Sequence, residues 1–197
     1  QTGSTIIVPR YDPTITAAPD GPPDLQGIDA VMTDVRWPAA ARLALAAARA
    51  AGIPGILDAD MAPRDVLDAL VPEASHIVAS ESAAKLLTGA EAPEGAAWRL
   101  FDEHGVFVAV TAGAHGCWWT EGAAIRHTAA PKIDAIDTLA AGDVFHAGFA
   151  VGLTEGWPMG RTIAFASAAA AIKCTRFGGR LGAPTRNEVE AFMAAQG

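Results

Sequence analysis

The sequence has few of the features that mark membrane, secreted or nucleic-acid-binding proteins. Hydrophobic residues make up 51% of its 197 residues, yet charged residues interrupt every apolar run well short of a membrane span. Its 14 Lys and Arg residues form no cluster, and the net charge is −8, which argues against nucleic acid as a partner. No basic segment followed by an apolar segment indicates a signal peptide. We therefore expect a cytoplasmic protein that binds neither membranes nor nucleic acids.

Cysteine is also scarce. Cys117 and Cys174 are far apart in the sequence, and each lies among apolar or small residues. A metal site would need more ligands close by, and a disulfide framework would need more cysteines. The sequence predicts two buried free thiols.

Short apolar runs and helical patterns alternate along most of the chain. Strands are predicted at residues 30–33, 56–60, 76–79 and 106–111. Helices are predicted at residues 38–51, 65–70, 82–87, 94–104, 158–173 and 185–195. Residues 117–120 and 124–127 instead predict a hairpin, with Gly122 in its turn. This order predicts an α/β fold with a mostly parallel sheet, helices on both faces and an antiparallel edge hairpin.

Residues 136–148 form the stretch around which the chain is organised. A short strand end is predicted at residues 133–136, small residues follow, and an apolar helical pattern runs to Gly156. The free N–H groups of a helix start form an anion site, and Ala140, Ala141 and Gly142 would let a phosphate approach. Asp143 would repel a phosphate but could accept a proton from a hydroxyl that attacks one. The alternative from spacing alone is that Asp143 only caps the helix.

Two further stretches follow predicted strands. The segment from Thr111 through Gly113 to Gly116 could approach a ligand closely, or it could be an ordinary tight turn. Ser80 lies between a strand and a helix, where it could act as an N-cap. Arg36 follows the first predicted strand, on the edge where α/β sheets bind ligands, and a surface salt bridge is its alternative role.

The run Asp-Thr-Leu-Ala-Ala-Gly-Asp-Val-Phe at residues 137–145 resembles the second signature of the ribokinase-like (PfkB) carbohydrate kinases. The resemblance implies a three-layer α/β/α ribokinase-like fold and an enzyme that uses ATP and Mg²⁺. It also implies that Asp143 is the catalytic base, and that Ala140, Ala141 and Gly142 form the anion hole with the backbone of Asp143.

The same resemblance assigns a nucleotide site to residues elsewhere in the chain. These residues are Thr111, Gly113, Gly116, Ser80, Ser167 and Gly178. Where the family has Asn-x-x-Glu to order magnesium, this chain has Ser80 and Ala83, so either Glu81 supplies the carboxylate or ATP and water hold the metal. His115 is expected to face solvent beside the nucleotide.

Two further assignments follow from the resemblance. The glycines at 178, 179 and 182, beside Asp137, would form a loop for a monovalent cation. Arg36 would contact the substrate, and its guanidinium would favour an anionic ketose such as sulfofructose.

The chain starts with Gln1, and the Gly-Gly substrate motif of the family is not found near its start. Residues 1–197 are therefore expected to be the C-terminal two thirds of a single kinase domain, with residues 1–27 a lid remnant or an irregular leader. A homodimer would form through the missing lid. The predicted function is ATP-dependent phosphorylation of a sugar hydroxyl. The alternatives are a non-catalytic sugar or nucleotide sensor, and a nucleoside- or pyridoxal-type kinase.

Overall fold

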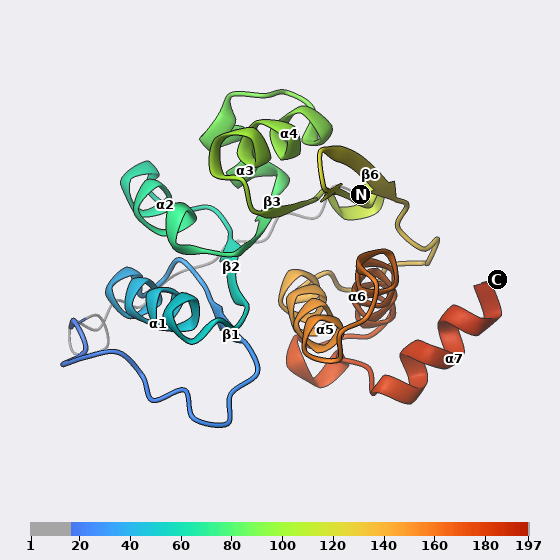
Figure 1. Ribbon diagram of the computed structural model, residues 1–197. Coiled ribbons are helices and arrows are strands. Elements are labelled where there is room, and N and C mark those ends of the chain that lie inside the picture. The colour runs from blue at the N-terminus through green and yellow to red at the C-terminus, as the bar shows by residue number, and fades with distance from the viewer. Residues whose placement is uncertain (1–16, 197) are drawn as a thin grey trace.

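The computed structural model describes residues 17–196 (Figure 1). The strands are β1 (Val31–Thr33), β2 (Gly55–Ala59), β3 (His76–Ser80), β4 (Phe107–Thr111), β5 (Cys117–Glu121) and β6 (Ala124–Thr128). The α-helices are α1 (Pro38–Ala51), α2 (Arg64–Leu70), α3 (Glu81–Thr88), α4 (Pro93–His104), α5 (Ala141–Thr154), α6 (Met159–Cys174) and α7 (Arg186–Gln196).

The strands form one sheet in the order β1-β2-β3-β4-β5-β6. Pairing is parallel from β1 to β4 and antiparallel between β4 and β5 and between β5 and β6. Because consecutive parallel strands are neighbours, right-handed crossovers place α1 to α4 on one face of the sheet. Figure 1 shows these helices on one side, α5 and α6 on the other, and α7 outside α6. The predicted three-layer fold with an antiparallel edge hairpin is confirmed.

Alternating side chains of the central strands are buried on opposite faces. Leu57, Ile77 and Val108 pack beneath α1 to α4 in one core cluster. Their sequence neighbours Ile56, Val78 and Ala109 pack in a second cluster with α5 and α6. Burial on both faces explains why these strands read as continuous apolar runs rather than as alternating patterns.

Proline and glycine set several helix boundaries. Pro38 occupies the first turn of α1, where the missing N–H has no intrahelical partner to lose. Gly52 ends the same helix in the left-handed conformation at φ 70°. Gly89 and Gly105 end α3 and α4 in the same way. These boundaries agree with the predicted ones to within one or two residues.

Two local predictions are wrong. Residues 133–136 form no strand; they are a loop whose end is held by N–H groups of Ile136 and Asp137, both donating to Cys174 O at 2.8 and 3.2 Å. Cys174 is only half-buried, whereas Cys117 is buried as expected. Burial raises the pKa of the Cys117 thiol to about 12, so this thiol is unreactive at neutral pH.

Residues 17–30 contain no helix or strand, and the first part of the segment expected to be a lid remnant or an irregular leader lies outside the described residues. Within the described part of the chain, no helix is long and apolar enough to cross a membrane.

Helices α5 and α6 approach closely because α5 carries glycine where they meet. A Cβ atom at Gly148 would lie 3.0 Å from Ala166 Cα, and one at Gly152 would lie 2.6 Å from Thr162 Oγ1. Both distances are too short for a side chain, so the two glycines set the spacing between the helices.

Gly152→Ala should therefore destabilise the fold by about 1–3 kcal/mol, since the added methyl group must push α6 away. Gly95→Ala is the matched control, because Gly95 is also helical and its nearest neighbour, Ala90 Cβ, would be 3.7 Å from the new methyl group. The control should stabilise by about 0.5–1 kcal/mol through helix propensity. Urea unfolding of the complete protein measures both, and equal effects would contradict this packing.

Candidate active site

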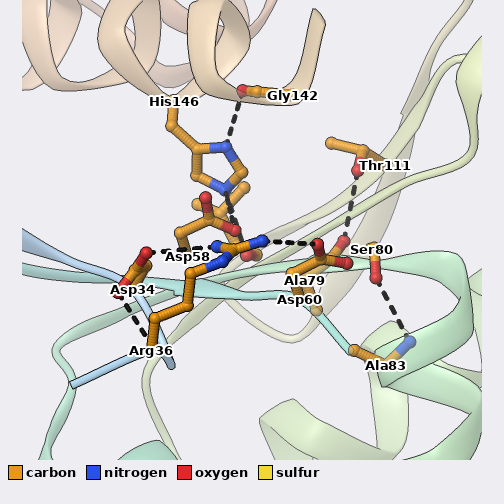
Figure 2. Close-up of polar contacts among 11 residues, drawn as sticks. Asp34, Arg36, Asp58, Asp60, Ala79, Ser80, Ala83, Thr111, Gly142 and His146 are labelled. Atoms are coloured by element: carbon orange, nitrogen blue, oxygen red, sulfur yellow. Dashed lines mark hydrogen bonds and ion pairs between the residues drawn. The ribbon is translucent and has the colours of Figure 1, made fainter. Parts of the chain in front are cut away.

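The carboxyl ends of the parallel strands bring polar side chains to one edge of the sheet. Asp34 and Asp60 follow β1 and β2, and Ser80 and Thr111 end β3 and β4. Figure 2 shows these side chains along this edge, with α5 above them. Open parallel sheets bind ligands at this edge, so it is the first place to search for a site.

The start of α5 faces the same edge. Ala140 precedes the helix in the left-handed conformation, with φ 61° and ψ 17°. The N–H of Ala141 donates to Thr138 O at 3.1 Å. The N–H groups of Ala140, Gly142 and Asp143 have no acceptor among the described residues. The predicted anion hole therefore has donors at these three positions, while Ala141 contributes only a small side chain.

Two cavities meet at this helix start. One, of about 440 Å³, is lined by Met32, Thr33, Asp34, Trp37, Ala40, Ala41, Ala44, Asp58, Asp143 and His146. The other, of about 700 Å³, is lined by residues of β3, β4, α6 and their loops, and by Ala141 and Gly142. Gly142 and Asp143 are consecutive residues of α5, yet they line different cavities. A group transferred from one cavity to the other would pass the free N–H groups at the start of this helix.

The larger cavity contains most of the residues predicted to bind nucleotide. Its lining includes Thr111, Gly113, Gly116, Ser80, Glu81 and Ser167. Gly178 is not among them, and neither is His115, which is exposed as expected. Among the described residues of this lining, Glu81 and Lys132 carry the charged side chains.

Two of these residues also have structural roles. Ser80 Oγ accepts a hydrogen bond of 3.2 Å from the N–H of Ala83, so it is the N-cap of α3. Gly116 is held at φ 92°, and a Cβ there would lie 2.2 Å from Thr128 O, so only glycine fits. Ser80 and Gly116 therefore have the structural roles that were the alternatives to nucleotide binding. Both residues also line the larger cavity.

The smaller cavity is bounded by a buried His–Asp pair. His146 Nε2 lies 3.3 Å from Asp58 Oδ1 and 3.2 Å from Val78 O, and Nδ1 lies 2.7 Å from Gly142 O (Figure 2). Both ring nitrogens thus face oxygen atoms. Nδ1 can donate to Gly142 O, and Nε2 can donate to Asp58 or Val78 O, or it can accept a hydrogen bond from Asp58 when that carboxyl carries a proton. Burial raises the pKa of the Asp58 carboxyl and nearby carboxylates add to this, while His146 acts in the opposite direction.

Arg36 lies beside the smaller cavity with its charge compensated. Its NH1 atom is 3.1 Å from Asp34 Oδ2, and its NH2 atom is 3.8 Å from Asp60 Oδ2 (Figure 2). The hydrogen bond to Asp34 raises the pKa of Arg36. The side chain is 52% exposed. The alternative role as a surface salt bridge is thus present, and the Arg36 guanidinium is already paired.

Two residues of the site were not predicted as functional. Asp58 was only part of a predicted strand, and His146 was not singled out. Asp34, Asp58 and Asp60 follow or end adjacent strands, which could have assigned them to one edge. His146 comes three residues after Asp143, so helical spacing alone could have placed both on one face of α5.

Comparison with known proteins adds to this geometry. The model of the pfkB family carbohydrate kinases matches residues 21–186. Ribokinase from Haemophilus influenzae is 36% identical over 138 residues, which are 67% of this chain and 45% of that protein. The chain spans less than half the length of the curated relatives it matches.

Solved structures agree with the sequence comparison. A candidate ribokinase from Agrobacterium tumefaciens has a TM-score of 0.92 and 44% identity, covering 98% of this chain and 65% of its own. Arabidopsis thaliana ribokinase, solved with ribose and ATP, has a TM-score of 0.78 and 25% identity, covering 89% of this chain and 61% of its own.

The left-handed turn at Ala140 gives a testable prediction. Among the described residues, only Ala140 combines a side chain with a positive φ. Ala140→Gly should relieve about 1–2 kcal/mol of steric cost, partly offset by the greater freedom of glycine in the unfolded chain, for a net gain of roughly 0.5–1 kcal/mol. Ala141→Gly, one residue later in the helix, should instead lose about 0.5–1 kcal/mol. Thermal unfolding measures both, and a loss at Ala140 would refute the left-handed turn.

Proposed function

Because the chain belongs to the pfkB family of carbohydrate kinases, we propose that it carries the phosphoryl-transfer site of an ATP-dependent kinase acting on a sugar hydroxyl. The observation that carries this proposal is that Asp143 lines the smaller cavity while its neighbour Gly142 lines the larger one. The larger cavity would hold the nucleotide, and the smaller one would hold the acceptor. The phosphoryl group would cross at the start of α5.

Asp143 is the proposed general base. Its carboxylate lines the acceptor cavity, where it can take the proton of the attacking hydroxyl. The N–H groups of Ala140, Gly142 and Asp143 would stabilise negative charge on the transferring group, since they have no acceptor among the described residues. The helix dipole of α5 favours negative charge at the same point.

The larger cavity suits a nucleoside triphosphate with its magnesium ion. Glu81 lies exposed in the first turn of α3, and Lys132 lines the same cavity. No group of three or more metal-ligating side chains occurs in residues 17–196, which fits an ion that binds one protein carboxylate and is held mainly by phosphates and water. When bound, Mg²⁺ would neutralise charge on the ATP phosphates. Glu81 is the residue we propose to hold it, with Lys132 pairing a phosphate oxygen.

The acceptor cavity favours a neutral, polyhydroxylated sugar. Asp34, Asp58 and Asp143 line it and can accept hydrogen bonds from hydroxyl groups. Thr33, also in the lining, carries the one buried side-chain oxygen without a partner among the described residues, which a sugar hydroxyl could supply. An anionic group there would meet the carboxylates of Asp34, Asp58 and Asp143, and the Arg36 guanidinium beside Asp34 is already paired.

The anionic ketose expected from the sequence, with sulfofructose as the example, is the second candidate. One observation supports it: the half-exposed Arg36 guanidinium pairs with Asp34, which lines the acceptor cavity. Binding an anion there would require Arg36 to leave Asp34 or Asp60. A nucleoside- or pyridoxal-type acceptor would use the same chemistry at Asp143.

A non-catalytic sugar or nucleotide sensor remains the alternative from another class. Such a protein would not need a carboxylate at the start of α5, where the two cavities meet, so Asp143 argues for catalysis. The remaining proposals concern the whole protein: residues 1–197 as the C-terminal part of one kinase domain, a homodimer through a lid outside the described residues, and a place in the cytoplasm, where ATP is available.

The base is tested by Asp143→Asn, which keeps the size of the side chain but cannot accept the proton. In the complete protein, kcat should fall by about 10²–10⁴, while the Kd for ATP stays unchanged or decreases because a like charge has been removed. Asp134→Asn is the matched control, an exposed carboxylate before the same turn, and it should keep full activity. Turnover retained in Asp143→Asn would exclude Asp143 as the base.

The charge of the acceptor is tested with Arg36→Met and Asp60→Asn. For a neutral acceptor, kcat/KM of the unaltered protein should be higher with a ketose than with the same ketose bearing a sulfonate. Arg36→Met should then change KM for the neutral sugar by less than about threefold, since an exposed ion pair contributes little. If the acceptor is anionic, Arg36→Met should raise its KM by about 10–100-fold, and Asp60→Asn, which frees the guanidinium, should lower it.

A further inference from the structure

Lys173 is a buried cation for which the proposed reaction has so far given no role. It lies in the last turn of α6, and its side chain has no exposed surface. Its Nζ atom donates to Asp137 O at 2.7 Å and to Arg176 O at 3.4 Å, and it lies 3.4 Å from Asp137 Oδ2. These three oxygens match the three N–H donors of an ammonium group.

Both oxygens of the Asp137 carboxylate also accept hydrogen bonds. Its Oδ1 accepts from the N–H of Leu139 at 2.9 Å, and its Oδ2 accepts from the N–H of Gly178 at 2.9 Å. These two hydrogen bonds, with the nearby Lys173, lower the pKa of Asp137. The ion pair therefore joins a fully buried ammonium to a carboxylate that stays ionised at neutral pH, and removing either partner would leave the other uncompensated.

This pair connects two loops at the anion hole. Asp137 begins the turn that leads through Ala140 into the first turn of α5, and Gly178 belongs to the loop after α6. The N–H groups of Ile136 and Asp137 also donate to Cys174 O, so the main chain is held on the same side. The ammonium of Lys173 thus fixes the turn from which the free N–H groups at residues 140–143 project.

A monovalent cation, expected here from the sequence, does not fit this arrangement. Such an ion needs several oxygen ligands, and three oxygens near this loop are Asp137 Oδ2, which accepts from the N–H of Gly178, Asp137 O and Arg176 O. All of them already face Lys173 Nζ. A second positive charge among these oxygens would be strongly repelled by the ammonium.

We propose that the Lys173 ammonium replaces a monovalent cation, acting as a positioning residue that holds the anion hole, so that phosphoryl transfer requires no added K⁺. This inference rests on the proposed kinase function. Lys173 itself lines neither cavity, so it acts through the turn at residues 137–140.

The test compares rates of the complete protein in KCl and in tetramethylammonium chloride at equal ionic strength. The unaltered protein should show the same kcat in both salts, within about twofold. Lys173→Ala should lose about 10–100-fold in kcat in tetramethylammonium, with KM for the sugar unchanged, and K⁺ should restore most of the loss by entering the vacated space. Lys173→Met fills that space, so K⁺ should not restore it. Lys85→Ala, an exposed lysine paired with Glu91, is the control and should match the unaltered protein.

A second readout does not depend on catalysis. K⁺ should raise the Tm of Lys173→Ala more than that of the unaltered protein, Lys173→Met or Lys85→Ala, because only the alanine variant has a vacant cation position. A K⁺ requirement in the unaltered protein, or no effect of K⁺ on the Tm and kcat of Lys173→Ala, would overturn the proposal. If no sugar is phosphorylated, the kinase proposal fails, and the Tm comparison still decides the role of Lys173.

Discussion

The packing of α5 on the sheet is the interaction on which the site depends. Phe145 and Phe149 are buried with Ile56 and Val78 in one core cluster, so the face of α5 that follows Asp143 is fixed against the central strands. This packing directs the N-terminus of the helix toward the carboxyl ends of the parallel strands. The catalytic candidate therefore lies beside Asp58, a residue far away in the sequence. Core packing and site geometry have the same cause.

Much of this arrangement could be predicted from the sequence, because the governing signals are local. Proline and glycine mark helix boundaries, as at Pro38 and Gly52, and apolar runs mark the buried strands. The small residues before Asp143 indicated a helix start with free N–H groups. Local signals also explain the wrong prediction at residues 133–136, where the apolar residues suggested a strand. Ile136 is 70% exposed, and the main chain there forms hydrogen bonds to Cys174 O. That contact joins distant parts of the chain.

Charge compensation is the part that could not be predicted. A sequence shows that Arg36 and Lys173 are basic, but it does not show which carboxylate each one meets. In the structure Arg36 is shared between Asp34 and Asp60, and Lys173 is buried against Asp137. These pairings weigh against two expectations, a free guanidinium for an anionic sugar and an open loop for a monovalent ion. Both depended on the net charge left over after pairing, which is a property of the folded chain.

The central claim is that the acceptor and the nucleotide bind on opposite sides of the start of α5. A crystal structure of the complete protein with a non-hydrolysable ATP analogue and a sugar acceptor tests this most directly. The account predicts a sugar hydroxyl within about 2.6–3.2 Å of the Asp143 carboxylate. It also predicts the terminal phosphate of the analogue at the N–H groups of Gly142 and Asp143. A nucleotide bound in the smaller cavity, or a sugar bound away from Asp143, would contradict it.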